Sequence, residues 1–181
     1  MPNYCNYEMK IKGSKRAIER VMGCLKATYD YYEGKPSHKH FFRSYVDYEN
    51  ETTQNEDGTF SKIVLGACAW SVKSCMCTGW GTYYEYAKKE HKDIFMGTSL
   101  KEQSRGCEIE VFGEEPGVGF SEHLIFKNGK CLCNEVADVE PAGYDENYNV
   151  TTDIDWDTYD GDVLCSNPFR EDKTQEYAWE I

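Results

Sequence analysis

The sequence predicts an α+β fold built on an antiparallel sheet, and three observations lead to that prediction. Residues 107–112 alternate small or apolar with charged side chains, as a half-buried strand does. Residues 120–126 and 130–139 flank Asn128-Gly129, a dipeptide that accepts the two positive φ angles of a type I′ hairpin turn. Apolar residues at helical spacing between positions 18 and 29 predict an amphipathic helix that precedes these strands.

In the first half of the chain we expect a strand, this helix and two more strands. Gly13 ends the first strand, and Ser14 is a good N-cap residue for the helix, which should end before Gly34. The predicted strands cover residues 4–11, 40–53 and 60–72, with a turn at residues 55–58 between the last two.

In the second half two helices are expected before the strands named first. One covers residues 83–95; the other covers residues 98–105, where Ser99 and Glu102 have capping-box spacing and Gly106 can end the helix. The element order is therefore β-α-β-β-α-β with an added hairpin strand. This order predicts the split βαβ, or ferredoxin-like, arrangement, with one or two helices on one face of the sheet.

Acidic residues are concentrated near the C-terminus. Residues 1–134 contain 18 acidic and 18 basic residues, whereas residues 135–181 contain 14 acidic residues against Arg170 and Lys173. The whole net charge of -12 therefore lies in the last quarter of the chain, which is typical of an interaction tail or of a face of one sign. We predict a folded domain at residues 1–140 and an acidic, aromatic-containing extension at residues 141–181, packed on or beside it.

Nothing in the sequence predicts membrane insertion or export. The longest apolar run, residues 63–72, is much shorter than the roughly 18 residues that span a bilayer, and residues 1–5 lack the features of a signal peptide. The nine cysteines are interpreted as reduced thiols, because an odd number cannot pair completely within one molecule. We therefore expect a cytoplasmic protein.

Two groups of residues invite a metal-site hypothesis. Cys75-Met-Cys77 and Cys131-Leu-Cys133 would each present two thiols on one face of a strand, so that neighbouring strands could form a four-cysteine zinc site. We favour the alternative that these cysteines are small core-facing hydrophobes. The run that starts at Asp153 begins like a calcium loop, but Thr158 and Leu164 stand where glycine and glutamate are needed. The prediction is no metal and no cofactor.

No pattern predicts catalysis. The four histidines and nine cysteines form no triad motif or Cys-His signature, and we interpret His123 as a surface or packing residue. The protein is therefore predicted not to be an enzyme.

Two basic clusters could contact phosphate. In the first cluster, aromatic residues are interleaved with the basic ones, as in four-stranded sheets that stack RNA bases, but the consensus RNP strand is missing and the pI is about 4.8. We favour solvated faces over nucleic-acid binding. The first cluster contains Lys35, His38, Lys39, His40 and Arg43 with Phe41, Phe42 and Tyr45, and the second contains Lys88, Lys89, His91 and Lys92.

Three short motifs resemble a family of phage- and plasmid-encoded proteins of unknown function with a ferredoxin-like domain. The motifs are Met1-Pro-Asn-Tyr-Cys5, Trp80-Gly-Thr82 and Glu115-Pro-Gly-Val-Gly-Phe120. Their order and spacing agree with the family over residues 1–139. The resemblance implies an origin in a mobile genetic element, a bacterial host cytoplasm and no known catalysis.

Combined with the charge map, the resemblance leads to a functional hypothesis. The acidic extension would imitate a nucleic-acid backbone and occupy the basic groove of a host defence protein, most concretely as an anti-CRISPR inhibitor of a guide-loaded Cas nuclease. The alternative is a nucleic-acid-binding accessory protein whose acidic tail is autoinhibitory. Either protein could also form a homodimer. The predicted partner-binding residues are Asp153, Asp155, Trp156, Asp157, Tyr159, Asp160, Asp162, Glu171 and Asp172.

Overall fold

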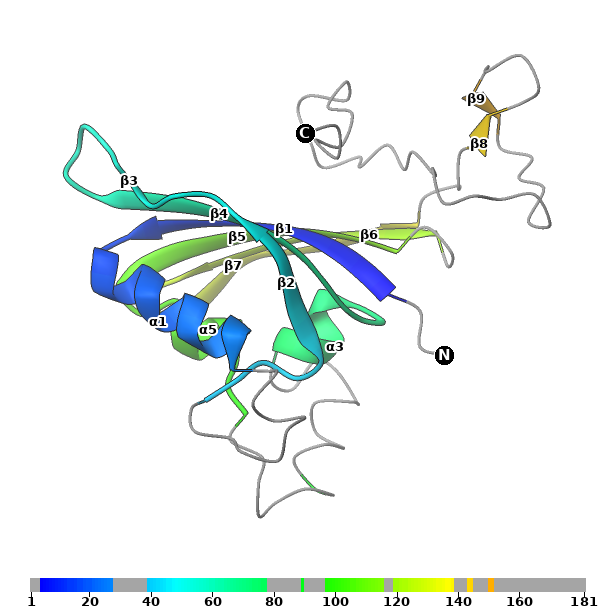
Figure 1. Cartoon of the computed structure of the whole chain (residues 1–181). Helices are drawn as coiled ribbons and strands as arrows, with labels where there is room; N and C mark the ends of the chain where they lie inside the picture. Colours follow the sequence, from blue (N-terminus) through cyan, green and yellow to red (C-terminus); the bar gives the residue numbers. More distant parts are fainter. Residues whose placement is uncertain are drawn as a thin grey trace.

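A computed structural model describes residues 4–27, 39–77, 89, 97–115, 119–138, 143–144 and 150–151. The main sheet has seven antiparallel strands in the order β2-β4-β1-β5-β6-β7, and β3 also pairs with β4 (Figure 1). Its strands are β1 (Tyr4–Gly13), β2 (Ser44–Glu49), β3 (Thr53–Gln54), β4 (Phe60–Ala69), β5 (Cys107–Glu115), β6 (Phe120–Lys127) and β7 (Lys130–Asp138). The described helices are α1 (Lys15–Lys26), α3 (Val72–Met76) and α5 (Leu100–Gln103), and a separate pair of strands consists of β8 (Gly143–Tyr144) and β9 (Val150–Thr151). The predicted α+β class with an antiparallel sheet is confirmed.

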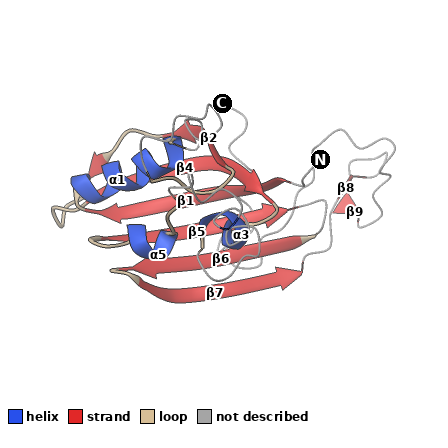
Figure 2. Cartoon of the chain, turned by 90° about the horizontal axis from the view of Figure 1, so that it is seen from below, coloured by secondary structure: helices blue, strands red, loops and turns tan. Residues whose placement is uncertain are grey.

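All three described helices lie over the same face of the sheet (Figure 2). Alternate residues of β1, including Met9 and Ile11, are buried on this face together with Ile18, Val21 and Leu25 of α1. The helix begins where the sequence predicts, because the Ser14 side chain accepts a hydrogen bond from the Ala17 N–H at 3.2 Å. The core is therefore a single layer of side chains between sheet and helices.

Several predicted boundaries need correction. The strand expected at residues 40–53 is divided into β2 and β3, and the strand expected to reach residue 72 ends at Ala69, because Ser71 caps α3. The short helix at residues 98–105 is α5, where Ser99 accepts from the Glu102 N–H at 3.2 Å. Apart from Lys89, which is helical, the predicted helix at residues 83–95 lies outside the described residues.

The hairpin between β6 and β7 has the predicted turn but an unpredicted bulge. Asn128 and Gly129 have φ angles of 49° and 79°, as a type I′ turn requires. Beyond the turn, Cys131 is paired with Phe126 and Cys133 with Ile125, so Leu132 is an extra residue in β7. Because side chains alternate along a strand, this one residue decides which face each later side chain of β7 occupies.

We call the sheet face opposite α1, α3 and α5 the outer face. Its residues alternate with the buried core residues of the same strands. Cross-strand pairing places charged, aliphatic and aromatic side chains next to one another there. Its central residues are Glu8, Lys10, Ile63, Leu65, Glu108, Glu110, Phe112, His123, Ile125, Cys133 and Glu135.

Candidate functional site on the outer face of the sheet

His123 of β6 lies at the centre of the candidate site. It is paired with Phe112 of β5 on one side and with Glu135 of β7 on the other. Its ring stacks on the Phe112 ring with centroids 4.6 Å apart and planes inclined by 3°. The Lys10 ammonium lies 5.4 Å from the Phe112 ring centroid. With 14% of its side chain exposed, the imidazole is held in one plane at the surface of the sheet.

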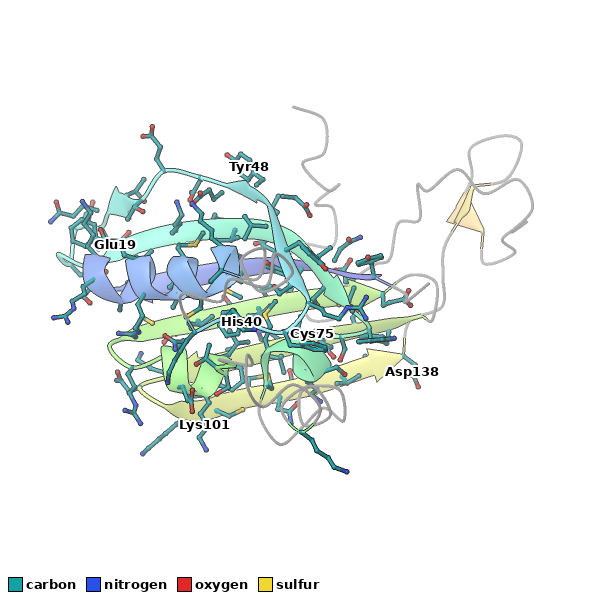
Figure 3. The ribbon with its side chains drawn as sticks, turned by 60° about the horizontal axis from the view of Figure 1, so that its bottom comes forward. Glu19, His40, Tyr48, Cys75, Lys101 and Asp138 are labelled. Carbon is teal, nitrogen blue, oxygen red and sulfur yellow. The ribbon has the colours of Figure 1, made fainter. Side chains whose placement is uncertain are left out.

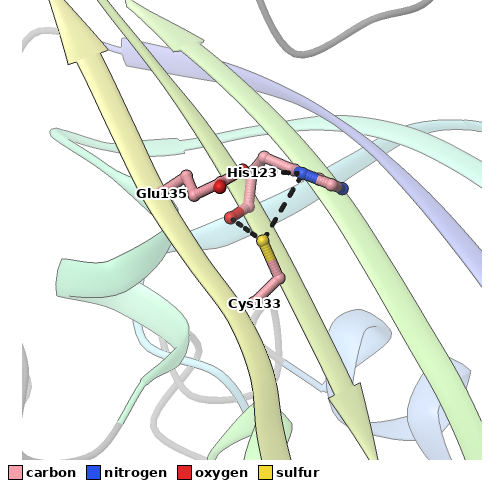
Figure 4. A group of neighbouring side chains, drawn as sticks. All are labelled: His123, Cys133 and Glu135. Carbon is pink, nitrogen blue, oxygen red and sulfur yellow. Dashed lines mark hydrogen bonds and ion pairs between the residues drawn. The ribbon is translucent and has the colours of Figure 1, made fainter.

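Polar groups contact both ring nitrogens of His123. Figure 4 shows His123 with Cys133 and Glu135, which lie on the Nδ1 side of the ring. Nε2 lies 2.9 Å from Oε1 of Glu110, and Nδ1 lies 3.5 Å from Oε2 of Glu135. The Sγ atom of Cys133 is 3.6 Å from Nδ1 and also donates to the His123 carbonyl oxygen at 3.6 Å. Three strands thus supply a histidine, a cysteine and two carboxylates to one small area.

The bulge at Leu132 positions this cluster. A regular two-residue hairpin that pairs Lys127 with Lys130 would place Asn134 opposite His123. The extra residue instead places Glu135 opposite His123 and turns Cys133 toward the same face. The prediction for His123 as a surface or packing residue missed its neighbours, although the alternation of Cys133 and Glu135 after the hairpin turn is a signal in the sequence.

The Cys133 thiol is not activated in this arrangement. Burial raises its pKa, and the hydrogen bond to Glu135 and the negative charge of that carboxylate raise it further. The reactive form of cysteine in Cys-His catalysis is the thiolate, which a lowered pKa favours. The raised pKa therefore does not favour nucleophilic attack by Cys133.

Many charges near the cluster are paired. Lys10 contacts Glu8 at 3.3 Å, and Lys127 contacts Glu108 at 2.8 Å. Such exposed pairs contribute little stability, but they leave the described outer face with alternating signs rather than a strong field of one sign.

The four-cysteine zinc hypothesis is wrong. Cys75 lies in α3 and not on a strand (Figure 3). Both Cys75 and Cys77 are buried. Cys131 packs against the core, whereas Cys133 lies on the outer face, so the four sulfur atoms do not share a face. The favoured alternative, core-facing thiols, is confirmed for Cys75 and Cys77.

The favoured prediction of a solvated face around residue 41 is wrong for residues 40–42, and the RNA-stacking alternative is not supported there either. Phe41 and Phe42 are buried and cannot stack on bases, and His40 is buried beside them. Arg43 lies over Trp70, with 4.9 Å between its guanidinium carbon and the ring centroid.

The predicted partner-binding residues lie outside the described residues. They are Asp153, Asp155, Trp156, Asp157, Tyr159, Asp160, Asp162, Glu171 and Asp172.

Comparisons of the chain with protein-family models, with curated proteins and with solved structures each found no match. Among the described residues there is also no helix long and apolar enough to cross a membrane.

Proposed function

We propose that this protein acts by binding another macromolecule, with its acidic C-terminal segment in a basic groove that normally holds nucleic acid. The observation that carries the proposal is the charge distribution: 14 acidic and 2 basic residues lie within residues 135–181, and the remainder of the chain is neutral. Carboxylates spaced along a segment can meet Lys and Arg side chains arranged for phosphates, and such association is fast and sensitive to salt.

The partner class that we propose is a host defence protein, most concretely a guide-loaded CRISPR nuclease. The resemblance to mobile-element proteins supports this choice. Within the segment, Trp156 and Tyr159 supply apolar anchor area among the acids, and aromatic residues often dominate binding energy at interfaces.

Gel filtration with a guide-loaded type II CRISPR nuclease tests the proposal. We expect the protein to co-elute with the nuclease at low salt and less so at high salt. Target DNA should displace the protein from the nuclease. The test variant replaces five segment acids by asparagine: Asp153, Asp155, Asp157, Asp160 and Asp162. The control variant removes the same charge from five exposed acids outside residues 135–181: Glu19, Asp47, Glu51, Glu56 and Glu102.

The proposal requires the test variant to lose co-elution and the control variant to retain it. Equal loss in both variants would indicate a general charge effect, and no co-elution of the natural protein would reject this class of partner.

A second candidate function is nucleic-acid binding with autoinhibition by the acidic segment. The observation that favours it is the exposure of Tyr4 and Tyr48 on the outer face, since exposed aromatic residues on sheets can stack on bases. The same five-asparagine variant separates the two functions. It should bind free single-stranded DNA or RNA more tightly than the natural protein if the segment is autoinhibitory.

We also propose that β1, β2, β4 and β5 with α1 form a ferredoxin-like unit. The strand order β2-β4-β1-β5 and the position of α1 between β1 and β2 support this assignment. In this proposal β6 and β7 are a hairpin added at one edge. An experimental structure with a second crossover helix beside α1 would be the expected result.

A further inference from the structure

We propose that His123, Cys133 and Glu135 form a binding site for one zinc ion. The Nδ1 atom, the Sγ atom and a carboxylate oxygen all lie within 4.8 Å of one another on the outer face. They come from the paired strands β6 and β7, whose backbones are joined by ladder hydrogen bonds on both sides of the bulge. The donors are therefore held close together before any metal binds.

The two separations measured from Nδ1 of His123 match those of ligands around tetrahedral zinc. With Zn–N near 2.05 Å and Zn–S near 2.3 Å, tetrahedral angles keep N and S about 3.6 Å apart and N and O about 3.4 Å apart. In the structure Nδ1 lies 3.6 Å from Sγ of Cys133 and 3.5 Å from Oε2 of Glu135. The third separation, between Sγ of Cys133 and the carboxylate oxygen of Glu135, is within 4.8 Å, so a side-chain adjustment without a change of backbone register would bring the three atoms around one ion.

Glu110 has the position of a supporting residue. Its Oε1 atom lies 2.9 Å from Nε2 of His123, so it can accept a hydrogen bond from Nε2–H and leave the Nδ1 lone pair free for the metal. A carboxylate that accepts a hydrogen bond from a metal-bound histidine is the usual second contact in zinc sites. Phe112, stacked on the same imidazole, restricts rotation of the ring.

The ligand atoms of the site determine which metal ions it prefers. Thiolate and imidazole favour zinc and similar transition metals over Ca²⁺ and Mg²⁺, which prefer oxygen donors. Three protein ligands leave a fourth tetrahedral position for water or for a side chain of a partner. The side chain of Glu135 is 57% exposed, so the site is accessible from solvent.

Cobalt titration of the full chain tests the proposal, with untagged, reduced and metal-free protein. We expect one equivalent of Co²⁺ to produce the near-ultraviolet thiolate band and strong visible bands of tetrahedral cobalt, and Zn²⁺ to abolish both. Zn²⁺ should also raise the Tm. Cys133→Ser should remove the thiolate band, and His123→Ala should weaken binding at least tenfold.

Two matched controls make the test specific to this site. Cys131→Ser changes a thiol two residues away that packs on the opposite face, and it should leave the cobalt spectrum unchanged. Glu110→Gln should weaken binding by about 10-fold, the lower end of the range for supporting residues. Glu108→Gln, two residues earlier on the same strand, should have no effect.

The fold of each metal-free variant is checked by circular dichroism and Tm. A thiolate band that persists in Cys133→Ser, or that Cys131→Ser abolishes, would assign binding to other thiols and overturn the proposal. Absence of a tetrahedral cobalt spectrum in the natural protein would overturn it as well.

Discussion

The imidazole of His123 lies flat on the ring of Phe112, with 4.6 Å between centroids and 3° between planes. The two residues are direct partners across β5 and β6. This contact joins the hydrophobic part of the outer face to the cluster of Cys133, Glu135 and Glu110. Because the Phe112 ring fixes the plane of the imidazole, it also sets the direction in which the ring nitrogens of His123 point.

A double-mutant cycle measures that contact. We expect the coupling between Phe112→Leu and His123→Leu to be about 0.5–1.5 kcal/mol in the free energy of unfolding, the range for stacked aromatic pairs. Urea unfolding of the natural protein, both single variants and the double variant gives the value. A coupling near zero would mean that the stacking contributes nothing to stability.

The bulge in β7 is tested by two single-residue deletions. Deletion of Leu132, whose side chain is 59% exposed, removes the extra residue and keeps Cys133 and Glu135 on the outer face. Deletion of Asn134 keeps Cys133 there but turns Glu135 to the opposite face. We therefore expect cobalt binding to be retained in the first variant and weakened in the second. The reverse result would contradict the observed register.

Glu122 should make stability fall as pH rises. Burial raises the pKa of this carboxyl, although the Lys73 N–H donates to its Oε2 atom at 3.3 Å. The folded protein thus binds the Glu122 proton more tightly than the unfolded chain does. The contribution of Glu122 to stability is therefore fully present below the unfolded pKa and is lost as pH rises through the folded pKa.

The Glu122→Gln variant isolates this effect from those of other carboxyls. Its free energy of unfolding, relative to the natural protein, should increase as the pH rises above about 4.3, the ordinary pKa of glutamate. Denaturant unfolding at several pH values provides the measurement. A difference that does not change with pH would show that Glu122 has the same pKa in both states.

Two glycine substitutions should have opposite effects. A Cβ atom at Gly66 in β4 would lie 2.1 Å from the Tyr45 carbonyl oxygen and 2.6 Å from the Tyr7 hydroxyl, which donates to that same oxygen at 2.8 Å. Gly66→Ala should therefore destabilise the protein by about 1–3 kcal/mol or more.

Gly23 in α1 is the control for this prediction. A Cβ atom there would meet nothing within 4 Å, and alanine favours the helix over glycine. Gly23→Ala should stabilise the protein by about 0.5–1 kcal/mol. Thermal unfolding of both variants checks the pair, and similar shifts of Tm would contradict it.

Local signals in the sequence predicted local structure well. The Ser14 cap, the Asn128-Gly129 turn and the alternation in β1 each depend on residues close in the chain, and all three are confirmed. Strand ends were less predictable: residues 70–72 continue an apolar run, but Ser71 caps a short helix instead. Local propensity alone does not decide whether the strand continues through these residues or a helix begins there.

By itself, the sequence determined the α+β class, the hairpin turn and the unequal distribution of charge, because composition and short-range pattern are sufficient for these. Only the tertiary structure decided that His123 is next to Cys133, Glu135 and Glu110. Those contacts depend on the pairing of three strands and on one bulged residue, Leu132. Because side chains alternate with a period of two, that one residue placed Cys131 against the core and Cys133 on the outer face.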